Sequence, residues 1–182
     1  MKQGQSLVVD YRKLKPQESG EYRLLRLESL KIYPNCFGSK YEVEKQKENL
    51  AFESYIENSN QESFIVGAFQ KDQLIGICGF YRLQDRQSRH KGEIIQMYVQ
   101  EAYQGRNIGY SLLLKTIAIA FTLEDLEQIN LEVMTENKAA RNVYEKAGFL
   151  EYGRQRSYTD ENRPSSEQMI MILNMKNWLT KK

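Results

Sequence analysis

The sequence predicts an α/β protein in which strands and helices alternate along a single domain. Residues 92–100 and 128–134 have the pattern of strands, and the long apolar stretch 109–124 between them has the pattern of a helix. A strand, a helix and a second strand at this spacing indicate a crossover between parallel strands. The chain has 182 residues, of which 41% are hydrophobic and 27% charged, as is typical of globular proteins. We therefore expect residues 1–182 to form one domain.

The N-terminal third is predicted to contain one strand and two helices. Residues 7–14 alternate weakly between apolar and polar side chains and indicate a strand. Pro16 favours a first helical turn, and apolar residues then recur at helical spacing up to the residue before Pro34. The same spacing over residues 42–58 predicts one continuous second helix.

The middle of the chain is predicted to form a hairpin and then the crossover. Residues 63–70 and 73–83 read as strands separated by a two-residue turn. A polar loop follows and leads into the strand 92–100.

The C-terminal part is predicted to contain a capped helix and two strands. Asn137 is a natural N-cap, and Gly148 fits the left-handed position just beyond the end of a helix. Residues 149–158 and 168–175 then read as strands joined by a turn-rich segment.

Charge and cysteine content exclude several function classes. The 26 basic and 24 acidic residues are spread along the chain, so no nucleic-acid partner is expected. No apolar run approaches the roughly 18 residues of a membrane span, and no signal sequence is evident, so we expect no membrane partner and a cytoplasmic location. Cys36 and Cys78 form no zinc or disulfide pattern, and His90 is the single histidine, so no metal site is expected.

Two glycines mark the start of the helix that follows the strand 92–100. Gly105 and Gly109 lie where the N–H groups and dipole of a helix N-terminus could bind a phosphate. The spacing is neither that of a Walker loop nor that of a dinucleotide fingerprint, which leaves a nucleotide-binding protein poorly supported. Without further context, the two glycines are equally compatible with a simple turn.

The context comes from two segments that resemble the hallmarks of one family, the GNAT acetyltransferases. The family's acetyl-CoA signature is Gln or Arg, two residues, Gly, one residue, and Gly or Ala. It is filled here by Gln104, Gly105, Arg106, Asn107, Ile108 and Gly109. The second hallmark is filled by Asn137, Ala140, Tyr144, Gly148 and Phe149. The resemblance covers residues 64–174 and keeps both segments in the family's order.

The resemblance implies a fold and an activity. The fold would be a mixed α+β sheet of six or seven strands, splayed in the middle and flanked by helices on both faces. The activity would be the transfer of an acetyl group from acetyl-CoA to a primary amine of a small molecule, an amino acid or a peptide N-terminus. Transfer would be direct, within a ternary complex, and would require no metal. Homodimers are common in the family, and the resemblance is to its bacterial members.

The resemblance also implies which residues hold acetyl-CoA. Backbone groups of Met97, Tyr98 and Val99 would bind the pantetheine arm, and Asn137 would contact it while capping its helix. The pyrophosphate would lie against the loop made by Gln104, Gly105, Arg106, Asn107, Ile108, Gly109 and Tyr110. Asn107 stands where the family usually has glycine, and asparagine tolerates positive φ best among the other residues. Arg106, Lys138, Arg141 and Lys146 could add positive charge near the phosphates or the adenosine.

The catalytic residues are expected on two elements. Tyr144 occupies the family's position for the acid that protonates the leaving thiolate, although a packing role is the alternative. An unperturbed phenol, with a pKa of about 10, can protonate a thiolate whose pKa is about 8.5. Glu132 points away from the apolar face of its strand and is the first candidate for a general base, with Glu93 as the second.

Two questions stay open at this level. A non-catalytic module that binds acyl-CoA is the alternative to an enzyme. The acceptor site would be built from the first helices and the last strands, where Tyr33, Phe37, Tyr41 and Tyr158 are candidate lining residues.

Overall fold

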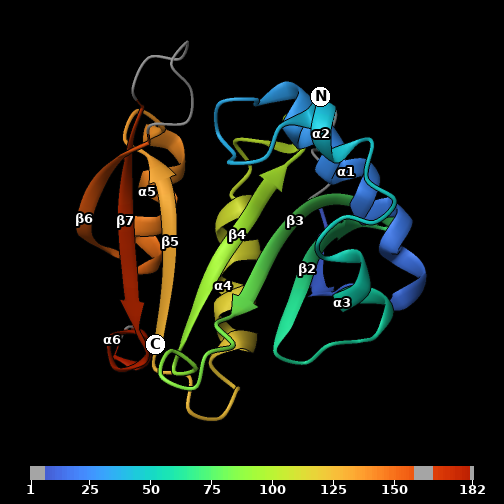
Figure 1. Cartoon of the computed structure of the whole chain (residues 1–182). Coiled ribbons are helices and arrows are strands. Elements are labelled where there is room, and N and C mark those ends of the chain that lie inside the picture. Colours follow the sequence, from blue (N-terminus) through green and yellow to red (C-terminus); the bar gives the residue numbers. More distant parts are fainter. Residues whose placement is uncertain (1–6, 158–165, 181–182) are drawn as a thin grey trace, which may run out of the picture.

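A seven-stranded mixed sheet forms the centre of the protein (Figure 1). The computed structural model describes residues 7–157 and 166–180. The strand order across the sheet is β1-β2-β3-β4-β5-β7-β6, and every neighbouring pair is antiparallel except β4 and β5. The strands are β1 (Asp10–Lys13), β2 (Ser63–Gln70), β3 (Gln73–Arg82), β4 (Lys91–Val99), β5 (Gln128–Met134), β6 (Leu150–Ser157) and β7 (Ser166–Asn174).

Helices cover both faces of the sheet. On one face, α1 (Ser19–Ile32) and α3 (Glu53–Glu57) pack against β2 and β3, with a core that includes Tyr22 and Ile77. On the other face lie α4 (Ile108–Ala120) and α5 (Lys138–Ala147), which share the larger apolar core. The remaining short helices are η1 (Pro16–Glu18), α2 (Tyr41–Glu44), η2 (Glu101–Tyr103) and α6 (Met175–Leu179). In the part of the chain that the structure describes, no helix is long and apolar enough to cross a membrane.

The sheet is split in the middle. β4 and β5 pair through only three residue pairs, which run from Lys91↔Gln128 to Glu93↔Asn130. Beyond these pairs the two strands diverge toward their C-terminal ends (Figure 1). The crossover through α4 and the splayed, seven-stranded mixed sheet are therefore confirmed.

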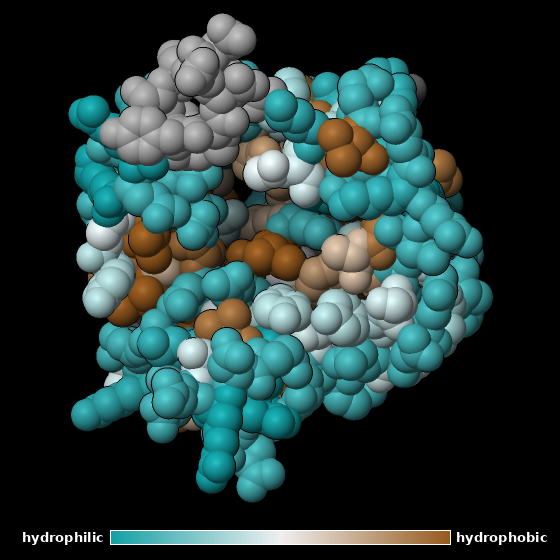
Figure 2. Space-filling view, viewed as in Figure 1, coloured by the Kyte–Doolittle hydropathy of each residue, from teal (hydrophilic) through white to brown (hydrophobic). Residues whose placement is uncertain are grey.

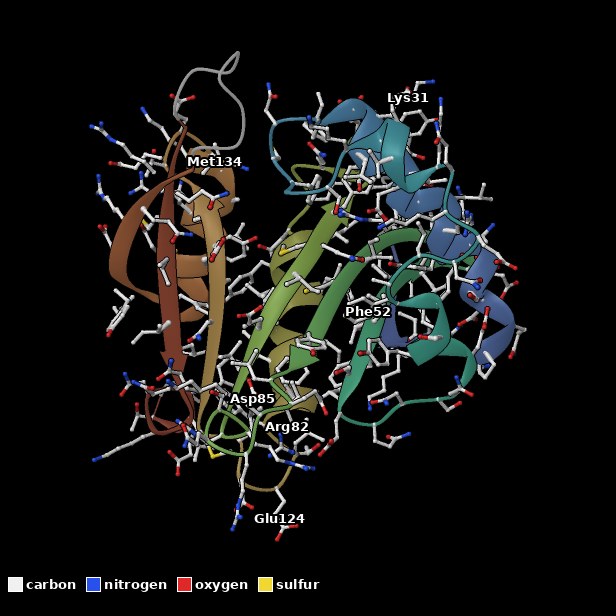
Figure 3. The ribbon with its side chains drawn as sticks, viewed as in Figure 1. Lys31, Phe52, Arg82, Asp85, Glu124 and Met134 are labelled. Atoms are coloured by element: carbon white, nitrogen blue, oxygen red, sulfur yellow. The ribbon has the colours of Figure 1, made fainter. Side chains whose placement is uncertain are left out.

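A buried arginine fixes the end at which β4 and β5 meet. Arg82 is 3% exposed, and its guanidinium donates to Arg89 O (2.8 Å), to Glu124 O (2.6 Å) and to the Glu62 carboxylate (3.0 Å). These contacts tie the loop before β4 to the loop before β5. Figure 3 shows Arg82 beside Asp85 and Glu124 at this end, whereas Met134 lies at the opposite end of β5.

The prediction of one helix over residues 42–58 is wrong, because the structure contains α2 and α3 with turns between them. Leu50 and Phe52 are both 2% exposed, and two residues that are two apart cannot share one face of a helix. Arg23 of α1 also donates to the carbonyls of Lys47 and Glu48, which a continuous helix would use itself. Tertiary contacts therefore override the local pattern.

The other predicted elements are present, with small differences at their ends. β2 and β5 have the predicted bounds, and α1 ends at Ile32, before Pro34. The short α6 was not predicted. Trp178 of α6 is 7% exposed and packs near Phe121, the residue after α4, with a ring separation of 6.5 Å.

Gly148 offers a stability test of the α5 C-terminus. Its φ is +106°, and its N–H donates to the carbonyls of Tyr144 (3.1 Å) and Glu145 (3.0 Å). We expect Gly148→Ala to lower the free energy of unfolding by about 1–2 kcal/mol, because a Cβ is disfavoured at positive φ. Gly20→Ala in α1 is the control: nothing lies within 4 Å of its added Cβ, and it should stabilise by about 0.5–1 kcal/mol. Urea denaturation measures both changes in the free energy of unfolding. Equal changes in the two variants would contradict the left-handed conformation of Gly148 at the end of α5.

Candidate functional site

A cleft opens where β4 and β5 diverge. It consists of a larger cavity of about 470 Å³ and a smaller one of about 110 Å³. The two cavities share six lining residues, Cys36, Phe37, Met97, Asn137, Ala140 and Tyr144, so they form one continuous space. The larger cavity extends over the start of α4, and the smaller one lies between β4 and β5. Figure 2 shows a hollow in the middle of this face with apolar residues at its margin.

The free edge of β4 is distorted by a β-bulge. Ile77↔Tyr98 and Gly79↔Ile95 are paired, so β4 has one residue more than β3 in this interval. Gln96, inside the bulge, has a φ of +54° and lines the smaller cavity. A bulge leaves the extra residue outside the regular ladder, and the bulged residues Gln96 and Met97 both line the smaller cavity.

Near its end, β4 presents a backbone N–H to the cleft. Gln100 N donates to Ile75 O (3.0 Å), and hydrogen-bonded pairs alternate with non-hydrogen-bonded pairs along an antiparallel ladder. Val99, opposite Gly76, is therefore in a non-hydrogen-bonded pair, and its backbone N–H and C=O point away from β3. The Val99 carbonyl already accepts from Gln104 Nε2 at 2.8 Å. Among the described residues, Val99 N–H therefore has no ladder partner on β3, and β5 is not paired with β4 at this level.

The glycine loop has the geometry of an anion site. Gly105 and Asn107 both have positive φ, +73° and +62°, which turn the chain sharply into α4. Asparagine thus adopts the left-handed conformation that the sequence predicted for position 107. The first hydrogen bond of α4 runs from Ser111 N to Asn107 O, which leaves the preceding N–H groups without helical acceptors. Their residues, from Ile108 to Tyr110, line the larger cavity.

Of the basic candidates outside the loop itself, Lys146 contacts the loop. Its Nζ lies 3.4 Å from Asn107 Oδ1 and 4.1 Å from the centre of the Tyr110 ring. Arg106 does not line the cavity, and its guanidinium lies 6.0 Å from the Tyr103 ring. Arg141 donates to Thr135 O (3.1 Å). Lys146 of α5 therefore adds a second positive charge beside the loop that already contains Arg106.

Tyr144 and Asn137 lie together in the wall of both cavities. Asn137 Oδ1 accepts from Ala140 N at 3.1 Å, so it caps α5 as expected. Tyr144 is 8% exposed, and its hydroxyl makes no hydrogen bond to the described residues. Burial raises the Tyr144 pKa, so the hydroxyl is protonated at neutral pH and can act as a donor.

The two candidate carboxylates differ in position. Glu132 on β5 lines the smaller cavity, is exposed, and accepts from Gln155 Nε2 at 3.4 Å. Glu93 on β4 is half-buried and does not line the cleft. Burial, and then the negative charge of Glu132, raise the pKa of Glu93. Glu132 is therefore the carboxylate that the structure brings to Tyr144.

The segment after α1 forms the remaining wall, and two of the four aromatic residues proposed from the sequence, Tyr33 and Phe37, line the cleft. Tyr33 lines the larger cavity, and Phe37 and Cys36 line both cavities. Tyr41 lies against Lys45 instead, and Tyr158 is outside the described residues. Burial also raises the pKa of the Cys36 thiol, which is therefore a poor nucleophile at neutral pH.

Side chains of α1 and its C-cap connect this wall to the loop. Tyr33 OH donates to Glu101 Oε1 (3.0 Å) and accepts from Gln104 Nε2 (3.3 Å). Glu28 accepts from Tyr98 OH (2.7 Å) and from Gln100 Nε2 (3.1 Å). These four bonds join one helix to the end of β4 and to the start of the glycine loop.

Comparison with known proteins supports one family. Residues 27–149 match the model of the acetyltransferase (GNAT) family. A spermidine N(1)-acetyltransferase of Vibrio cholerae is 26% identical over 77% of this chain and 79% of its own length. The N-alpha-acetyltransferase RimI of Mycobacterium tuberculosis is 37% identical over 51% of this chain and 56% of its own length. The structure of yncA from Salmonella typhimurium, a putative acetyltransferase solved with acetyl-CoA, has a TM-score of 0.75 at 13% identity, covering 92% and 94% of the two chains.

Tyr33→Phe tests the connection between α1 and the loop. The variant keeps the ring, which lies 6.0 Å from that of Tyr98, and removes the two hydroxyl hydrogen bonds. We expect the Kd for coenzyme A to rise about fivefold, since one such bond contributes about 1 kcal/mol, with little change in Tm. Calorimetric titration measures the Kd. Tyr55→Phe is the control, because Tyr55 makes ring contacts to Phe52 and Tyr81 away from the cleft. Equal affinities in all three proteins would refute a positioning role for Tyr33.

Proposed function

The chain belongs to the acetyltransferase (GNAT) family, and we propose that it transfers the acetyl group of acetyl-CoA directly to a primary amine. The acceptor would be a small molecule or a peptide N-terminus, bound with acetyl-CoA in one ternary complex. Both named relatives acetylate amines according to their names, one spermidine and the other an α-amine. The observation that carries the proposal is the cleft itself, in which unpaired N–H groups and a protonated Tyr144 share one cavity wall.

The larger cavity suits coenzyme A. The N–H groups at the start of α4 and the positive end of its dipole favour a pyrophosphate, and Lys146 adds a positive charge nearby. Val99 N–H would donate a hydrogen bond to a pantetheine amide, so that the pantetheine arm lies along the free edge of β4 in the manner of an added strand. Gly109 allows the start of α4 to pack closely on β4, because a Cβ there would lie 3.3 Å from Met97 Cε.

The smaller cavity suits the reaction. The neutral amine attacks the thioester carbonyl, a tetrahedral oxyanion forms, and the carbon–sulfur bond breaks as the amide forms. N–H groups of the bulged part of β4 would stabilise the oxyanion. Tyr144 would give its proton to the departing thiolate and regain one, directly or through water, from the nitrogen as the neutral amide forms. Glu132 accepts the proton that the ammonium must lose, directly or through water. Glu93 is the second candidate for this role.

The first test measures acetyl-CoA binding by calorimetry and then thiol release with spermidine, amino acids and peptides. We expect one-to-one binding and amine-dependent thiol release. In Tyr144→Phe, kcat should fall about 10²–10⁴-fold with little change in acetyl-CoA affinity, because only the proton donor is lost.

The control is Tyr152→Phe, since Tyr152 is 75% exposed and lies outside the cleft. Binding without thiol release from any amine would favour a non-catalytic acyl-CoA-binding module. No binding would contradict the proposal as a whole.

Glu132→Gln tests the general base. We expect kcat/KM at neutral pH to fall at least tenfold and to recover as pH rises, because the amine then loses its proton without help. A pH–rate profile measures the recovery. Unchanged activity at neutral pH would remove Glu132 from the mechanism.

Glu93→Gln is the matched substitution at the second candidate base, and it also carries a prediction for thermal stability. The pKa of Glu93 is higher in the folded than in the unfolded protein, so its ionisation lowers the free energy of unfolding. This loss of stability develops as pH rises from the unfolded pKa through the folded pKa. The variant should therefore melt higher than wild type at neutral pH and equally at low pH. A larger loss of kcat/KM in Glu93→Gln than in Glu132→Gln would exchange the two roles.

A further inference from the structure

Arg26 is a buried arginine that lacks the partners such a residue needs. It is 4% exposed, and its Nη1 is sealed from solvent with no hydrogen bond. Within residues 7–157 and 166–180, its guanidinium makes no hydrogen bond and no ion pair. By contrast, Arg23 on the same helix lies 2.8 Å from the Glu53 carboxylate. A buried charge without a partner is costly, so its presence calls for a compensating interaction.

The surroundings of Arg26 do not supply that interaction. Its Cζ lies 4.7 Å from the centre of the Phe37 ring, which covers one face of the guanidinium. The charged or titratable groups that act on it are Tyr22 and Glu44, and Glu44 is already paired with Lys47 at 2.7 Å. Burial lowers the Arg26 pKa, although the group stays charged at neutral pH. Stacking on a ring leaves the N–H groups in the guanidinium plane free to bind an anion.

Arg26 lies directly behind the smaller cavity. Phe37, which stacks on it, lines that cavity. Tyr22, which interacts with it, donates to Gln96 Oε1 at 2.8 Å, and Gln96 lines the same cavity. Phe37 belongs to the turns and bends between α1 and α2, where a small displacement disrupts no helix or strand.

One wall of this cavity carries a negative charge, and a positive charge lies beyond Phe37 in the opposite wall, outside the cavity lining. Glu132 of β5 lines it, and Arg26 lies behind Phe37 of the segment after α1. A ligand that satisfies both would carry a positive and a negative group a short distance apart. Amines and carboxylates on one small molecule have this arrangement, whereas a polyamine has positive groups only.

We propose that Arg26 binds a carboxylate of the acceptor, so that the acceptor is an amine that also carries a carboxylate, such as an amino acid. The inference rests on the proposed acetyl transfer and specifies its acceptor. A carboxylate would form two parallel hydrogen bonds with the edge of the guanidinium beside Phe37. A polyamine or a peptide N-terminus would leave Arg26 unpaired.

The experiment compares acceptors that differ only in a carboxylate. Ornithine is tested against putrescine and lysine against cadaverine, by thiol release in the presence of saturating acetyl-CoA. We expect kcat/KM to be at least tenfold higher for the amino acid of each pair. In Arg26→Met the ratio should fall to about one, while the Kd for acetyl-CoA stays unchanged.

A second measurement keeps the test independent of turnover. N-acetylornithine should raise the Tm of the wild-type protein more than N-acetylputrescine does, and this difference should vanish in Arg26→Met. The substitution should also raise the Tm of the ligand-free protein by several degrees, because it removes a buried, unpaired charge. Arg23→Met is the matched control: it breaks a paired arginine, so it should lower the Tm and keep the preference for carboxylates.

The outcomes separate the inference from the proposed function. Three outcomes would each overturn the role of Arg26. The diamines could react as fast as the amino acids or faster, the two products could shift the Tm equally, or Arg26→Met could have a lower Tm than wild type. A protein that binds no acetyl-CoA would instead contradict the proposed function.

Discussion

The site depends on the short parallel contact between β4 and β5. Three residue pairs hold the two parts of the sheet together, and Arg82 with its three acceptors fixes the loops around that contact. Because the pairing stops after Glu93, the edge of β4 keeps unpaired backbone groups over the rest of its length. The cleft, its backbone donors and the opposed walls of the smaller cavity all follow from this early stop.

The two faces of the sheet contribute different parts of the site. The face with α4 and α5 supplies the glycine loop, Lys146 and Tyr144, all within the two segments that resemble the family's hallmarks. The opposite face supplies α1, whose residues reach the site in two ways. Glu28, together with the C-cap residue Tyr33, holds the end of β4 and the loop, whereas Arg26 lies behind the smaller cavity. One helix thus shapes both the larger and the smaller cavity.

The sequence predicted the parts of the site whose geometry is local. The left-handed Asn107, the Asn137 cap and the Gly148 end of α5 follow from neighbouring residues, and the structure has all three. It could not predict Gln96, because glutamine at positive φ inside a strand leaves no sequence signal. Arg26 and Cys36 reach the cleft through contacts between distant parts of the chain. The missed break after α2 has the same cause, since Arg23 competes for the carbonyls of that segment.

The split sheet has a consequence for the catalytic cycle. Under the proposed function, the pantetheine arm takes the place of the backbone that β5 withdraws from β4 beyond Glu93. Beyond the three β4–β5 pairs, the edge of β4 then has a partner only while the cofactor is bound. Each catalytic cycle would begin and end with a divided sheet, and product departure would be the loss of a strand-like partner.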